Sequence, residues 1–224
     1  MKKSFFGLIV FAIFMPFLAY GQAVNGDQSI TQQFAAAMKA DAMENYGEAF
    51  PIFKKLADLG EPMSQYYVGN YYLQGLGIDR NDQQAFEWFS KAADVNYPQA
   101  LLATGKMLIA GIGIQKNLAA GITNLMAAGY YGNEEGLALS CIAYNLYLQD
   151  AYSGYYWCLL SSRHLSHQPQ LDGKVADVTR DVQVKLKAGQ IQSIAAKADD
   201  WQPKAWEYPT NFLSGFEEEE KENR

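Results

Sequence analysis

The 224-residue chain has the composition of an ordinary globular protein, with 49% apolar and 19% charged residues. Its 24 acidic residues against 18 Lys and Arg give a formal net charge of -6. Because a protein that binds phosphates needs clustered Lys and Arg, this acidic balance argues against a nucleic-acid partner. The length suits one domain or two small ones, with enough chain to bury a core.

The N-terminus has the features of a cleavable signal peptide. Two lysines precede an apolar run from Phe5 to Leu18, and small residues follow it. As a helix this run would span about 21 Å, which is less than the roughly 30 Å hydrocarbon core of a bilayer. We therefore expect a signal peptide over residues 1–23, cut after Ala23 or after Gly21, rather than a retained anchor. Cleavage would place the mature protein in a bacterial periplasm or outside the cell, with no stable membrane insertion.

The chain then repeats itself at an offset of 36 residues. The matching pairs are Pro62 with Pro98, Gly69 with Gly105, Gly75 with Gly111, Gly77 with Gly113, and Asn81 with Asn117. A fixed period of about 20 to 50 residues is typical of a solenoid of stacked repeats. Within each repeat we expect two helices. The segment Gly75-Leu76-Gly77 would end the first helix, and Asp82 would cap the second.

This pattern resembles the Sel-one-like (Sel1-like) repeat, a relative of the tetratricopeptide repeat. The Gly-x-Gly loop carries the resemblance, together with the motif Ala-x-x-Trp-Phe-x-x-Ala-Ala over residues 85–93. The resemblance covers roughly residues 30–165 and implies an all-α, α/α superhelical solenoid. We assign a signal peptide to 1–23, a tetratricopeptide-like unit to 29–61, Sel1-like repeats to 62–97 and 98–133, a divergent repeat to 134–166, a C-terminal helical cap to 167–203, and an acidic disordered tail to 204–224.

The predicted cap consists of two amphipathic helices. The first runs from Leu171 to Leu186, and the second from about Gly189 to Trp201. The last repeat of a solenoid exposes an apolar face, so these two helices would cover it.

No set of residues in the chain favours catalysis. His164 and His167 are the two histidines, and zinc requires three or four ligands, so we expect no metal site. The Gly-x-Gly pairs lack the third glycine of a dinucleotide-binding loop. Glu134 and Glu135 begin a helix, where negative charge stabilises the helix dipole. We therefore expect no catalytic residue and no cofactor.

The two cysteines, Cys141 and Cys158, leave two alternatives open. Cys141 takes the place of the close-packing glycine of the first helix, and Cys158 takes the place of Phe89 in the second. Both would therefore face the same seam between two helices. They would either form a disulfide, contributing about 3 kcal/mol in an oxidising compartment, or remain two buried thiols.

The candidate binding site lies on the concave face, which first helices line in related repeats. The residues at matching positions are Phe34, Met38, Met63, Tyr66, Asn70, Leu102, Lys106, Glu135 and Ile142. Their mixed chemistry suits a protein or peptide segment. We expect an exported, non-enzymatic scaffold or adaptor of the cell envelope. Two alternatives are a binder or hydrolase of cell-wall ligands (peptidoglycan or β-lactam) and a secreted host-contact factor.

Overall fold

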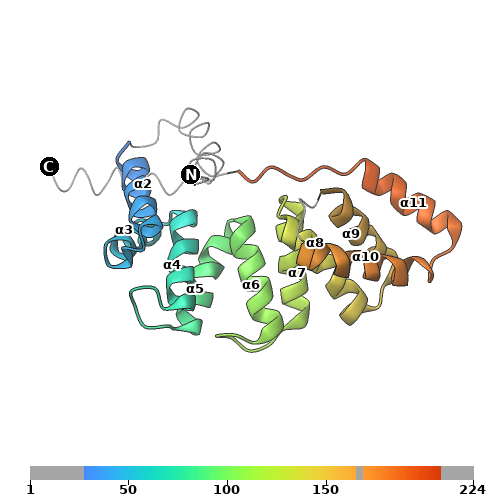
Figure 1. Ribbon diagram of the computed structural model, residues 1–224, viewed down its shortest axis with the longest axis horizontal. Helices are drawn as coiled ribbons and strands as arrows, with labels where there is room; N and C mark the ends of the chain where they lie inside the picture. Colours follow the sequence, from blue (N-terminus) through green and yellow to red (C-terminus); the bar gives the residue numbers. More distant parts are fainter. Residues whose placement is uncertain (1–27, 165–168, 208–224) are drawn as a thin grey trace, which may run out of the picture. The chain divides into compact units, whose positions relative to one another are not determined.

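The computed structural model describes residues 28–164 and 169–207, which contain helices and no strand (Figure 1). The α-helices are α2 (Gln28–Ala42), α3 (Tyr46–Asp58), α4 (Pro62–Gln74), α5 (Asp82–Asp94), α6 (Pro98–Ala110), α7 (Leu118–Tyr130), α8 (Glu134–Ala143), α9 (Ala151–His164), α10 (Pro169–Gln183) and α11 (Ala188–Asp199). None of the described helices is long and apolar enough to cross a bilayer. The predicted signal peptide lies outside the described residues, as does the chain from 208 onward.

The chain divides into two compact units. In the first, α2 and α3 pack against each other, with the rings of Phe34 and Phe53 edge to face at 5.7 Å. The second unit, Pro62–Glu207, holds α4 to α11. There each helix from α4 to α9 packs on the next, and both α10 and α11 pack on α9. This consecutive packing is that of an α/α solenoid, which confirms the predicted fold class.

The Gly-x-Gly turns require glycine for two different reasons. Gly75, Gly77, Gly111 and Gly113 all have φ between 68° and 74°, a conformation that side chains with a Cβ rarely adopt. At Gly113, a Cβ atom would also overlap the backbone carbonyl of Asp82 at the start of α5. The turn of one repeat therefore lies directly against the preceding repeat, and this contact sets their spacing.

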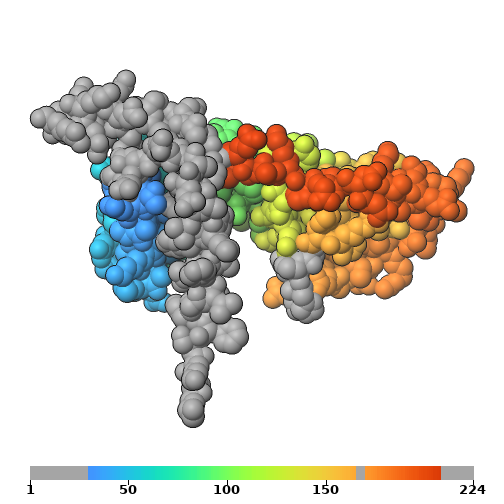
Figure 2. Space-filling model, turned by 90° about the horizontal axis from the view of Figure 1, so that it is seen from above, coloured from blue at the N-terminus to red at the C-terminus, as the bar shows by residue number. Residues whose placement is uncertain are grey.

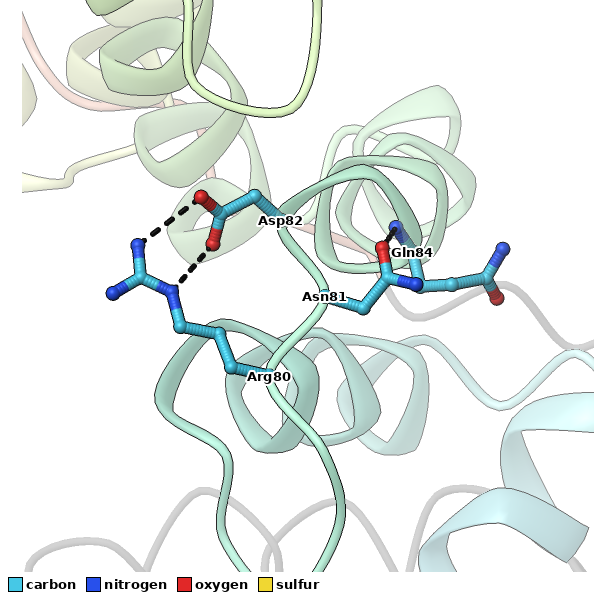
Figure 3. A network of polar contacts seen from close by, with 4 residues as sticks. All are labelled: Arg80, Asn81, Asp82 and Gln84. Carbon is cyan, nitrogen blue, oxygen red and sulfur yellow. Dashed lines mark hydrogen bonds and ion pairs between the residues drawn. The ribbon is translucent and has the colours of Figure 1, made fainter.

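The second helices are capped by asparagine and not, as predicted, by Asp82 (Figure 3). The Asn81 side chain accepts a hydrogen bond from the Gln84 backbone N–H at 3.0 Å, and Asn117 caps α7 in the same way. Asn81 is extended and can turn its side chain back over the first turn, whereas Asp82 is already helical. Asp82 instead accepts two hydrogen bonds from Arg80, at 2.8 and 3.1 Å, which lower the pKa of its carboxyl.

The third repeat lacks the Gly-x-Gly turn. A π-helix, η1 (Tyr144–Leu148), follows α8 directly, and Gln149 ends it with a φ of 52°. This compact connection takes the place of the Gly-x-Gly turn of the two preceding repeats.

The C-terminal helices pack on α9. Val175 and Val182 of α10 and Ile194 and Ala198 of α11 are buried. After α11 the chain runs back along the unit in an extended form, drawn in red in Figure 1. We call residues 201–207 the strap.

The strap corrects the predicted boundary between the cap and the tail. Residues 204–207 were expected to begin a disordered tail, but Trp206 packs with Tyr97 and donates a hydrogen bond to the Val95 carbonyl oxygen at 2.9 Å. A tryptophan that is half-buried and hydrogen-bonded holds this end of the chain on the repeats, which charge composition alone does not predict.

Candidate functional site

The first helices of successive repeats align three equivalent residues. Asn70, Lys106 and Ile142 follow each other at the 36-residue offset, on α4, α6 and α8. The Nζ atom of Lys106 lies 2.6 Å from Oε1 of Glu135, so an ion pair joins α6 to the next first helix. Leu102 is half-buried one helical turn before Lys106. We call Asn70, Leu102, Lys106, Glu135 and Ile142 the first-helix face.

Two other predicted residues of α4 contribute to the core. The Tyr66 ring lies 5.4 Å from that of Phe89 and 5.6 Å from that of Tyr97, measured between centroids. Met63 packs against the buried cluster of Ala92, Tyr97 and Ala100. A substitution at Tyr66 would therefore disturb packing between α4 and its neighbours.

The remaining predicted residues lie in the other unit, on α2. Phe34 is 7% exposed and packs against Phe53, so its side chain cannot reach a partner without opening that hairpin. This burial corrects its assignment to a binding face. Met38 is half-buried on the same helix.

A disulfide joins Cys141 of α8 to Cys158 of α9, with their Cα atoms 4.6 Å apart. The same place in the two preceding repeats holds a glycine beneath a large side chain. At Gly69 a Cβ would lie 2.6 Å from the Phe89 ring, and at Gly105 it would lie 2.9 Å from Leu125. The disulfide therefore replaces, by a covalent bond, the close contact that holds the other helix pairs together.

The described residues contain no group of three His, Cys, Asp or Glu side chains that could hold a metal ion. The ring of His164 packs edge to face on Trp201 at 4.9 Å, while His167 lies outside the described residues. Glu134 and Glu135 do begin α8, but Asn133 supplies its cap through a 2.8 Å hydrogen bond from the Gly136 N–H.

One polar pair was not predicted. Lys197 of α11 donates a hydrogen bond to the hydroxyl of Tyr152 on α9 at 2.9 Å, which lowers the pKa of Tyr152. The two residues are 45 apart in sequence, and no motif links them. The pair lies at the surface and ties the cap to the last repeat.

Residues 62–97, which comprise α4 and α5, match the Sel1 repeat. The chain therefore contains a Sel1 repeat. The matched residues are those that the sequence predicts as the first of two Sel1-like repeats. Sel1 repeats are in general non-catalytic scaffolds for interactions between proteins.

Solved structures show the same fold at low sequence identity. A Sel1 repeat protein from Oxalobacter formigenes is similar with a TM-score of 0.59 and 20% identity, over 76% of this chain and 70% of that one. A protective antigen of uropathogenic Escherichia coli that displays an SLR fold has a TM-score of 0.50 and 17% identity. That match covers 86% of this chain but only 48% of the antigen. A comparison with curated proteins finds no significant match.

Proposed function

We propose that this Sel1-repeat protein is an exported, non-enzymatic scaffold that binds a protein or peptide through its first-helix face. The observation that carries the proposal is the ion pair between Lys106 and Glu135, which joins two successive first helices at the surface. Because rigid helices fix the positions of these side chains, a partner would bind with little loss of conformational freedom.

The chemistry of the face suits a polypeptide. Asn70, Lys106 and Ile142 occupy equivalent positions but offer an amide, a charge and an apolar group. Protein interfaces combine apolar contacts with scattered polar ones in this way. The side chains of Lys106 and Glu135 are 46% and 35% exposed, and a pair in such a setting contributes at most about 1 kcal/mol to stability. Both charges therefore remain available to a partner.

Two independent features support export. The first is the basic, apolar and small-residue pattern of residues 1–23. The second is the bond between Cys141 and Cys158, since disulfides persist in oxidising compartments such as the periplasm. We therefore propose a bacterial periplasmic or secreted location.

Cross-linking in living cells tests this function. The wild-type chain is expected to give a specific adduct in the exported fraction. The double variant Leu102→Asp/Lys106→Glu should lose at least about nine-tenths of that adduct, because it places acidic groups on the face beside Glu135. Lys106 is exposed and Leu102 is only half-buried, so helical content measured by circular dichroism should stay unchanged.

A control variant separates the face from a general charge effect. Lys185→Glu/Gln192→Asp makes the same changes in charge at exposed positions near and on α11. It should keep the adduct. Equal adducts from wild type and both variants would exclude the first-helix face, and an adduct found only in the cytoplasmic fraction would refute export.

A further inference from the structure

The strap crosses the turns that join one repeat to the next. Figure 2 shows it over the surface of the second unit, continuing from α11 beside the green and yellow helices. It begins at Trp201, which packs on His164 at the end of α9, and reaches Val95 at the end of α5. Seven residues therefore contact three successive repeats.

Trp206 is the main anchor at the far end of the strap. Its Nε1–H donates to the Val95 carbonyl oxygen at 2.9 Å, and its ring meets that of Tyr97 at 5.1 Å. The ring also packs against the cluster that includes Ala92 and Ala100. Partly desolvated aromatic residues with a hydrogen bond are typical of the strongest contacts in protein interfaces.

The middle of the strap makes a second set of contacts, one repeat further along. The backbone N–H of Lys204 donates to the Tyr130 carbonyl oxygen at 2.9 Å. The Lys204 ammonium lies 5.6 Å from the centre of the Tyr131 ring, within the range of a cation–π interaction. We call Val95, Tyr97, Tyr130 and Tyr131 the turn edge.

The hydrogen-bond acceptors of the turn edge are backbone carbonyl oxygens at the C-terminal ends of α5 and α7. Val95 is the C-cap of α5, and Tyr130 is the last residue of α7. The last carbonyls of a helix have no partner within it, and they carry partial negative charge. An extended segment with N–H donors and a cation can satisfy them. Since each repeat ends a helix at this edge, the acceptors recur along the solenoid.

The strap can be displaced more easily than a helix could. It has no regular secondary structure, and Gln202, Pro203, Lys204, Ala205 and Glu207 are exposed. Segments with few buried contacts open at low free-energy cost. Release of residues 204–207 would leave α10 and α11 in place, because Trp201 contacts the core of the cap.

We propose that the turn edge is a second peptide-binding surface, which the strap occupies in competition with a partner. The partner is an extended segment of another protein with a cationic residue and, two positions later, a tryptophan, as in Lys204 and Trp206. This inference names a peptide class and so rests on the proposed binding function. It concerns a different surface, however, so the result of cross-linking from the first-helix face does not depend on it.

A labelled peptide with the sequence of residues 200–207, Asp-Trp-Gln-Pro-Lys-Ala-Trp-Glu, tests the proposal by fluorescence anisotropy. Wild-type full chain should bind it weakly, since the tethered strap competes at high effective concentration. Trp206→Ala removes the anchor of the strap but leaves the turn edge intact. This variant should bind the peptide about tenfold more tightly. The control Glu207→Ala, at an exposed strap position, should bind like wild type.

The peptide with alanine in place of its second tryptophan should not bind any variant. Equal affinity of wild type and Trp206→Ala for the intact peptide would overturn the proposal, as would binding of the alanine peptide. Light scattering, which measures the mass of the particle in solution, tests whether two copies exchange their straps. If wild type were a dimer and Trp206→Ala a monomer, the occupant of the turn edge would be a second copy, and the proposal would again be overturned.

Discussion

Replacing Gly136 by alanine is expected to destabilise the protein by about 3 kcal/mol, near the upper end of overpacking effects. Gly136 is buried where α8 crosses α7. A Cβ there would lie 2.7 Å from the Gly129 backbone nitrogen and 3.0 Å from the Leu125 carbonyl oxygen. Backbone atoms cannot turn aside as a side chain can, so the two helices would have to separate. Urea unfolding followed by circular dichroism measures the change.

Gly173 provides a matched control for this substitution. It lies within α10, and a Cβ there would meet nothing within 4 Å. Gly173→Ala should therefore stabilise the protein by about 0.5–1 kcal/mol through the higher helix propensity of alanine. If both alanine variants stabilised the protein to the same extent, close approach of α7 and α8 would not be part of the fold.

Removal of the disulfide has the second large expected effect. The bond closes a loop with a sequence separation of 17, and breaking a loop of this size should lower the free energy of unfolding by about 3 kcal/mol. The variant Cys141→Ala/Cys158→Ala is expected to show this loss in urea unfolding. Wild type in the presence of a reductant should move in the same direction.

A second double variant separates the covalent bond from the packing around it. Cys141→Gly/Cys158→Leu reproduces the pair formed by Gly105 and Leu125 in the preceding repeat. It should be more stable than the double-alanine variant, because a large side chain again fills the space above position 141. No difference between oxidised wild type and the double-alanine variant would contradict a stabilising role for the bond.

Periodicity was sufficient to predict the repeats. The 36-residue offset relates positions that the structure uses in the same way, such as the glycines 69 and 105 beneath a large side chain. The same offset places Cys141 at the position of Gly69 and Gly105, while its disulfide partner Cys158 lies three residues before the position that the offset from Leu125 would give. Such positions are predictable because stacked helices impose the same close contact in every repeat.

Periodicity was not sufficient where a residue's role depends on the ends of helices or on irregular backbone. Asn81 and not Asp82 caps the N-terminus of α5. The two residues are neighbours, but only Asn81 lies outside the helix, where its side chain can accept a hydrogen bond from the first turn. The strap has no apolar period, and Trp206 was its one signal: a large aromatic residue close to an acidic tail. Phe34 shows a further limit, because an apolar residue on a first helix can face either the core or a partner.

Site-specific photo-cross-linking from the first-helix face tests the proposed function most directly. A photoreactive residue at Leu102, beside the ion pair of Lys106 and Glu135, should give one discrete adduct in the exported fraction of irradiated cells. The same residue at Gln192, which is exposed on α11, should give none. Absence of an adduct at Leu102, or equal adducts at the two positions, would contradict a partner-binding role for this face.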